Sequence, residues 1–208
     1  MGTRGLTCVV KGKEFKVANY NQWDSYPSGQ GVTALNFLST KLNLALFNEK
    51  VSKVKVLSDE ARQDMMVECG AKRGSEWITM DVSDNFKKNF PYLHRDCGAE
   101  ILEFVQNLPE GLALTSQLSF AADSLFCEWA YLIDLDKNTF EVYQGFNKDS
   151  LTSDDRFYFL SEASKSKDDT SGSEQYQPVK LVKSYSLFEL PDEETFNKEC
   201  EPREEDEE

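Results

Sequence analysis

Two pairs of short β-prone runs, each joined by a tight turn, constrain the fold of this chain more than any other feature. The first pair, residues 6–10 and 14–20, is rich in Val, Phe and Tyr and is separated by a turn that contains Gly12. The second pair, residues 126–135 and 139–144, flanks a polar Asp-Lys-Asn turn. Strands that follow one another in hairpins run antiparallel, so the pattern favours a mainly antiparallel sheet over a doubly wound parallel one.

The sequence between the two hairpins shows helical periodicity. Apolar residues recur at helical spacing over 32–46, 58–69 and 96–109, and further strands are expected at 156–160 and 179–188. The expected capping residues of the second and third helices are Ser58 and Asp96. The sequence therefore predicts an α+β fold, a sheet built from hairpins and covered by about three helices.

Charge divides the chain into a body and a tail. The net charge is −14, and residues 191–208 contain ten acidic residues against two basic ones, which leaves −6 for residues 1–190. We expect residues 1–190 to form a single domain with a mobile polar loop at 161–175, and residues 191–208 to be a disordered acidic tail.

The composition also limits the classes of partner and cofactor that we expect. A chain this acidic, with 39% hydrophobic and 29% charged residues and no long apolar run, indicates a globular protein that neither spans a membrane nor binds nucleic acid directly. Five widely spaced cysteines without a CxxC pair fit neither a disulfide framework nor a zinc site, and indicate the reducing cytoplasm. With a single histidine, His94, and no nucleotide-binding fingerprint, we expect no metal and no cofactor.

A bend at residues 20–31, between a predicted strand and a predicted helix, is the strongest candidate for a site, because loops in that place often bind ligands. We interpret Asp24 as a catalytic acid or base, or as an acceptor for a ribose hydroxyl. The ligand-binding candidates in the bend are Gln22, Trp23, Tyr26 and Gln30. A structural alternative stays open, in which Trp23 and Tyr26 anchor the core and Asp24 caps the turn.

Charged residues outside the bend complete the predicted site. Arg4 and Arg95 could each bind a carboxylate or phosphate through the planar guanidinium group, or could equally form structural ion pairs. Asp96 is a further ligand-binding candidate. Glu128 lies in an apolar run, where alternation places Cys127, Trp129 and Tyr131 on the opposite face, and is interpreted either as a second catalytic carboxylate or as half of a buried ion pair.

Four segments resemble a known group of proteins. MGTRGLTCVV, NYNQWDSYPSGQG, HRDCGAEIL and FCEWAYLIDLDKNTFEVYQG are similar to fungal and bacteriophage proteins that open with MGTR and carry a QWDGYPxGQG-like segment. The likeness covers most of residues 1–146 and departs from the pattern at Ser25, where Gly is common. It implies no particular reaction.

A second resemblance concerns fold alone. The order of strand, turn, strand and NQWD is similar to the opening of N-terminal-nucleophile hydrolases, and implies layers like theirs. The catalytic nucleophile of that class has no counterpart, because removal of Met1 leaves Gly2 at the N-terminus.

Two functions from different classes remain. The first is a small-molecule site for an anionic or nucleotide-like ligand, with hydrolysis as a further option, and it requires the candidate residues to converge. The second is a non-enzymatic acidic interaction protein, such as a phage-type inhibitor or nucleic-acid mimic, that meets a basic protein partner.

Overall fold

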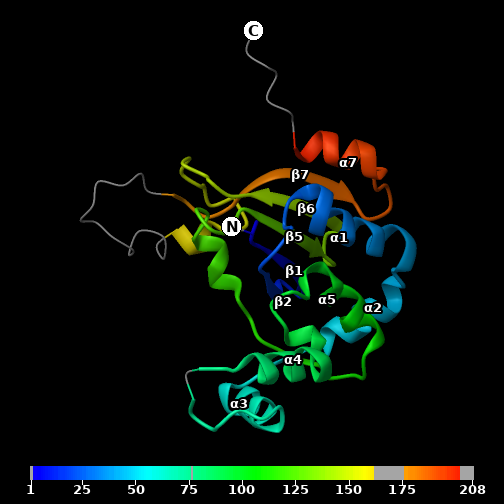
Figure 1. Ribbon diagram of the computed structural model, residues 1–208. Helices are drawn as coiled ribbons and strands as arrows, with labels where there is room; N and C mark the ends of the chain where they lie inside the picture. The colour runs from blue at the N-terminus through cyan, green and yellow to red at the C-terminus, as the bar shows by residue number, and fades with distance from the viewer. Residues whose placement is uncertain (1, 76, 162–175, 202–208) are drawn as a thin grey trace, which may run out of the picture.

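The α+β fold predicted from the hairpins is confirmed by a computed structural model that describes residues 2–75, 77–161 and 176–201 (Figure 1). Five strands form one sheet in the order β2-β1-β5-β6-β7, and a short parallel pair, β3-β4, lies apart from it. All neighbours in the large sheet are antiparallel except β1 and β5, which join the two hairpins in parallel. The strands are β1 (Gly5–Lys11), β2 (Glu14–Asn21), β3 (Lys55–Val56), β4 (Ala113–Leu114), β5 (Trp129–Asp134), β6 (Thr139–Gln144) and β7 (Lys180–Ser186).

Six α-helices occur in the described part of the chain, where the sequence predicted about three. They are α1 (Val32–Asn36), α2 (Leu44–Ser52), α3 (Asp59–Glu68), α4 (Met80–Asn89), α5 (Ile101–Asn107) and α7 (Glu193–Cys200). Short helical turns accompany them: η1 (Pro27–Gly31), η2 (Phe37–Lys41), η3 (Pro91–Leu93), η4 (Gly98–Glu100), η5 (Leu118–Ala122) and η6 (Tyr158–Leu160).

Both faces of the sheet are covered, which is why β1 and β5 are apolar almost throughout. On one face, Val9 and Tyr131 pack with α1, α2, α5 and α7, and on the other Leu6 and Leu132 pack with η5 and the segment before η6. All six residues of β5 are buried. The alternation predicted for this strand is wrong at Cys127, which packs on the Leu132 face because the strand begins only at Trp129 and the chain before it does not follow the pleat.

The predicted helix over 32–46 is interrupted. Helical structure runs from η1 through η2, stops at Leu42, and begins again after Asn43, whose side chain caps α2. The buried side chain of Gln106 holds this break, because its amide accepts from the Asn43 N–H at 2.8 Å and donates to the Lys41 carbonyl at 3.0 Å. A tertiary contact thus satisfies backbone groups that a continuous helix would have paired internally.

Two predictions near the C-terminus are wrong. The strand expected at 156–160 is a helical turn, because Phe157 inserts into the sheet face beside Tyr143 instead of pairing along an edge. The acidic tail is a helix over Glu193–Cys200, and its Phe196 is fully buried against Phe140 at 5.8 Å. Most of the polar loop predicted at 161–175, and residues 202–208, lie outside the described residues.

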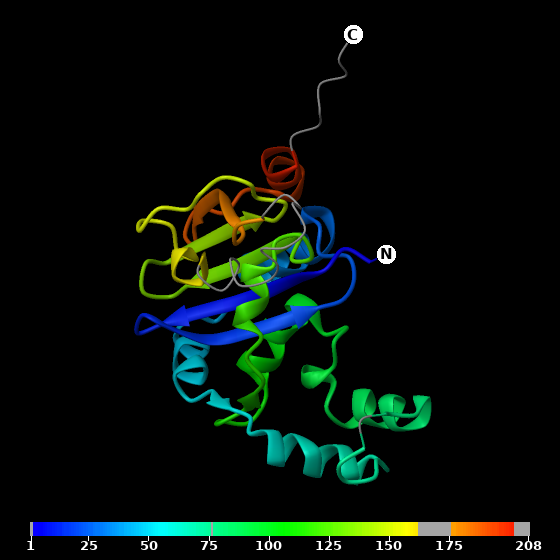
Figure 2. The same cartoon turned by 90° about the vertical axis from the view of Figure 1, so that its left-hand side faces the viewer.

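Helices α3 and α4 form an extension at one end of the molecule, away from the sheet (Figure 2). Ser58 caps α3 as predicted, whereas α4, capped by Thr79, was not foreseen. A small cluster of its own holds the extension together, with Cys69, Val82 and Phe86 at its centre. None of the helices within residues 2–75, 77–161 and 176–201 combines the length and the apolar character needed to cross a bilayer.

Candidate functional site

The bend after β2 is fixed by hydrogen bonds that reach the first and fifth strands. Asn21 donates to the Ser25 hydroxyl at 2.7 Å and to the Trp23 carbonyl, so its side chain closes the bend from within. The Ser25 N–H donates to the Thr3 carbonyl at 3.1 Å, and the buried Tyr131 hydroxyl donates to the Ser25 carbonyl at 2.7 Å. The bend is therefore tied to the start of β1 and to the central strand.

The two glutamines predicted to bind a ligand make protein contacts instead. Gln22 accepts from the Tyr20 hydroxyl at 2.6 Å, and Gln30 accepts from the Ala99 N–H at 2.7 Å. The φ of Gly98 is +53°, which favours glycine, and a Cβ there would lie 2.2 Å from the Gln30 side-chain oxygen and displace it from its hydrogen bond. Both amides hold the bend against its neighbours.

Trp23, Asp24 and Tyr26 lie at the surface of the bend. Trp23 is 46% exposed and Tyr26 is 37% exposed, so neither is the core anchor of the structural alternative. Asp24 has a left-handed backbone, with φ of +57°, and its carboxylate accepts from the Tyr26 hydroxyl at 3.3 Å. The charge of Asp24 raises the pKa of Tyr26, which keeps that hydroxyl protonated as a donor.

Arg95 and Asp96 lie beside the bend, where the exposed Arg95 guanidinium is 4.0 Å from the Asp96 carboxylate and Asp96 also contacts the helical extension. The Gln22 N–H donates to the Arg95 carbonyl at 3.1 Å, while Asp96 accepts from Lys87 of α4 at 3.0 Å. Burial by itself raises the pKa of Asp96, but the hydrogen bond from Lys87 and the nearby His94 outweigh it and lower that pKa. Asp96 does not cap the third helix as predicted, because the turn before α5 begins at Gly98 and Asp96 is engaged by Lys87.

Arg4 and Glu128 meet at the paired starts of β1 and β5. The Glu128 carboxylate lies 3.4 Å from the Arg4 N–H, and the Glu128 N–H donates to the Arg4 carbonyl at 2.9 Å. The Arg4 guanidinium lies over the Phe126 ring, 4.4 Å from its centroid. Among the residues that the structure describes, this half-buried guanidinium makes no hydrogen bond or ion pair, so all its N–H donors remain available.

Two exposed aromatic side chains, Trp23 and Phe126, lie beside the segment that carries Arg4. Trp23 packs against the backbone of Gly2, two residues before Arg4, and Phe126 is 40% exposed. Phe146, which follows β6 and is 50% exposed, lies outside this group, because its ring packs edge-on against Tyr176 with 6.3 Å between the centroids. We refer to the surface made by Arg4, Trp23, Phe126 and Glu128 as the Arg4 face.

Phe126 was missed as a site residue because it is the first residue of a predicted strand, where its aromatic character suited a core. Its exposure is visible only in the tertiary structure, where Gly145, just after β6, passes close to the backbone of Cys127. Glu128 forms no ion pair among the described residues, because its carboxylate lies by the Arg4 backbone N–H and not by the guanidinium, and its catalytic role stays a prediction.

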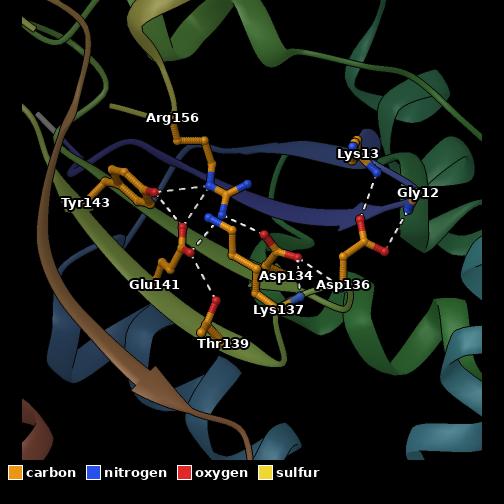
Figure 3. Close-up of polar contacts among 9 residues, drawn as sticks. All are labelled: Gly12, Lys13, Asp134, Asp136, Lys137, Thr139, Glu141, Tyr143 and Arg156. Carbon is orange, nitrogen blue, oxygen red and sulfur yellow. Dashed lines mark hydrogen bonds and ion pairs between the residues drawn. The ribbon is translucent and has the colours of Figure 1, made fainter. Parts of the chain in front are cut away.

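A second polar cluster lies at the opposite end of β5 from Arg4, near the turn that joins β5 to β6 (Figure 3). Arg156 binds Glu141 through Nε and Nη2, at 2.8 and 2.7 Å, and Asp134 through Nη2 at 2.6 Å. Tyr143 and Thr139 also donate to Glu141. Burial opposes the charge of Arg156, but Glu141 and Asp134 outweigh it and raise the pKa of the guanidinium.

The carboxylate oxygens of this cluster are all occupied by donors from the protein itself. The second oxygen of Asp134 accepts from the backbone N–H groups of Asp136 and Lys137, both at 2.9 Å, so each buried carboxylate oxygen has at least one donor. Such a network holds the hairpin turn and the loop before η6 together, and offers a ligand little to bind. Within the described residues, no three side chains among His, Cys, Asp and Glu are grouped as a metal ion would require.

Comparison with known proteins adds no relative: the chain matches none of the family models, curated proteins or solved structures against which it was compared. The resemblances to fungal and bacteriophage proteins and to N-terminal-nucleophile hydrolases stay predictions, as does the cytoplasmic location.

Proposed function

We propose that this protein binds a small anionic ligand on the Arg4 face. The observation that carries the proposal is the half-buried Arg4 guanidinium, which lies on the Phe126 ring and has no carboxylate partner within the described chain. A half-buried arginine without an ion pair among the described residues leaves its donors free for an added anion. A phosphate or carboxylate matches the planar fork of its donors.

The neighbours of Arg4 narrow the ligand class. Trp23 and Phe126 are 46% and 40% exposed and offer ring faces or edges to a planar group. Glu128, beside Arg4, repels a second anionic group but accepts from hydroxyls. These features together suit a nucleoside or sugar monophosphate, with phosphate on Arg4 and hydroxyls on Glu128.

Hydrolysis is not part of this proposal. Asp24 is engaged by the Tyr26 hydroxyl, and Glu128 faces the Arg4 N–H. Across the described ranges, no hydrogen bond joins either carboxylate to a Ser, Thr or Cys that could act as a nucleophile. The acidic interaction protein and its basic partner stay an alternative prediction from composition.

The proposal is tested by isothermal titration and thermal shift with adenosine monophosphate, ribose 5-phosphate, inorganic phosphate and adenosine. We expect the monophosphates to bind and adenosine to bind at least about tenfold more weakly, since the charge-assisted contact to Arg4 is missing. Arg4→Lys should weaken the monophosphates, and Glu128→Gln should alter the preference for ribose 5-phosphate over phosphate.

The matched control is Lys137→Ala, which removes one exposed positive charge in the turn after β5, at the opposite end of that strand. Binding that is equal for adenosine and its monophosphate, or equally weakened in Lys137→Ala and Arg4→Lys, would refute an anion site on this face. Stabilisation by none of the four compounds would refute the proposed ligand class.

A further inference from the structure

The helical extension contains a groove between α3 and the loop that follows it. The groove has a volume of about 280 Å³, and its walls include Met66 and Ala71 from apolar positions and Asp59, Arg62 and Lys72 from charged ones. It is formed by the extension alone and owes nothing to the sheet or to the Arg4 face. Helix α3 has no buried residue, so the face it turns to the groove is open to a partner.

The two cations in the groove are unengaged. Within the parts of the chain that the structure describes, neither the Arg62 nor the Lys72 side chain forms a hydrogen bond or an ion pair, whereas the neighbouring Arg73 is paired with Asp64. Among the described residues that line the groove, Arg62 and Lys72 face a single acidic residue, Asp59, which gives this lining a net positive charge in a chain whose total is −14. A complementary ligand is therefore negatively charged.

Exposed apolar residues lie next to the lining residue Ile78 in the chain, just before α4 and at its first position. Trp77 is 86% exposed, Met80 is 81% exposed, and Ile78, which also lines the groove, is 51% exposed. Ser75 fixes the turn before them through a hydrogen bond from its hydroxyl to the Trp77 carbonyl at 2.8 Å. Exposed apolar residues grouped in this way mark interaction surfaces, and a tryptophan is the residue type most often dominant in binding.

We propose that this groove binds a segment of a partner protein in which acidic and large apolar residues alternate. Its acidic side chains pair with Arg62 and Lys72, and its apolar side chains cover Trp77, Ile78 and Met80. A lipid surface fits less well, because Arg62 and Lys72 line a groove between elements, which an extended peptide can enter and a flat layer of headgroups cannot. The small core around Phe86 lets the extension present this surface without disturbing the sheet.

The test uses the full-length protein and a fluorescein-labelled peptide in which Glu alternates with Leu and Phe. We expect saturable binding in fluorescence anisotropy that weakens with added salt, and no binding of a peptide with Lys in place of each Glu. The double variant Arg62→Ala/Lys72→Ala should weaken binding by roughly tenfold or more, and Trp77→Ala by about fivefold. These side chains are exposed, so circular dichroism of each variant should match that of the native protein.

The control of equal charge is Lys137→Ala combined with Lys198→Ala, which also removes two exposed positive charges and should leave peptide binding unchanged. Equal binding of the Glu and Lys peptides, or equal binding by the double variant and the control, would overturn the proposal. Binding to phosphatidylserine vesicles that is lost in Trp77→Ala, with no binding of the peptide, would assign the surface to a membrane instead. None of these outcomes depends on ligand binding at the Arg4 face.

Discussion

Two half-buried arginines, Arg4 and Arg156, stand in opposite situations. Arg156 binds two buried carboxylates in a network where each carboxylate oxygen is satisfied. Arg4 rests on an aromatic ring, and within the described residues no acidic group pairs with its guanidinium. Both side chains come from loops that border the same sheet, so the difference lies in what the neighbouring strands supply.

The comparison shows that a half-buried charged side chain points to a ligand site when no partner of opposite charge lies within the protein. The Arg156 network is self-contained, because Asp134 and Glu141 come from adjacent strands and meet one cation between them. At Arg4, the adjacent carboxylate of Glu128 faces the backbone instead, which leaves the guanidinium for another anion. One site therefore explains stability, and the other supports a proposal about function.

The largest effect is expected from Arg156→Met. Removing the cation leaves Asp134 and Glu141 buried and mutually repelling, at a cost of about 3–5 kcal/mol in the free energy of unfolding. Urea denaturation followed by circular dichroism measures it. Adding Glu141→Gln to this variant removes one buried charge and should recover part of the loss; no recovery would contradict the electrostatic explanation.

A smaller, pH-dependent effect is expected from Tyr143→Phe. Burial, together with the charge of Glu141, raises the pKa of Tyr143 above its usual value of 10.0. The folded state thus keeps a proton that the unfolded state releases, so this contribution is complete below pH 10 and is lost as the pH rises further. Near neutral pH, loss of the hydroxyl hydrogen bond to Glu141 should lower the free energy of unfolding by about 1 kcal/mol.

Between pH 10 and 11, the free energy of unfolding of Tyr143→Phe should therefore fall less steeply than that of the native protein. Unfolding free energies measured across that range give the two slopes. Buried thiols such as Cys8 and Cys97, whose pKa values burial raises to about 12, add a similar alkaline loss from pH 9 upward in both proteins. Parallel pH profiles for the two proteins would show that Tyr143 does not titrate with unfolding.

The smallest stability effect is expected from Arg4→Met, which matches the change made at Arg156. Loss of the contact with Phe126 should cost less than about 1 kcal/mol, since the guanidinium has no carboxylate to leave unpaired. Urea denaturation of the two methionine variants, side by side, measures the contrast. A cost at Arg4 as large as at Arg156 would mean that Arg4 is structural.

Local patterns were sufficient for the elements whose stability is local. Both hairpins follow from alternating β-prone runs around short turns, and α3 follows from its Ser58 cap. The helix at the C-terminus was missed because its charge outweighed the single apolar pair Phe196 and Cys200, which lie four residues apart and face the sheet.

The candidate site was predicted only in part. The bend after β2 is at the surface, and the backbones of Arg4, Arg95 and Glu128 lie around it or at the adjoining strand starts. Gln22, Gln30 and Asp96 are engaged by Tyr20, Ala99 and Lys87, which are partners that no spacing in the sequence reveals. Whether a polar side chain is free depends on residues far away in the chain.

By itself, the amino-acid sequence determined the strands of both hairpins, the mainly antiparallel sheet and the position of the bend, because each depends on residues close together in the chain. Only the tertiary structure decided that β1 and β5 pair in parallel, that Arg156 is satisfied and Arg4 is not, and that a helical extension exposes Trp77. Burial and pairing of charge are properties of the packed molecule, since they depend on which distant segments meet.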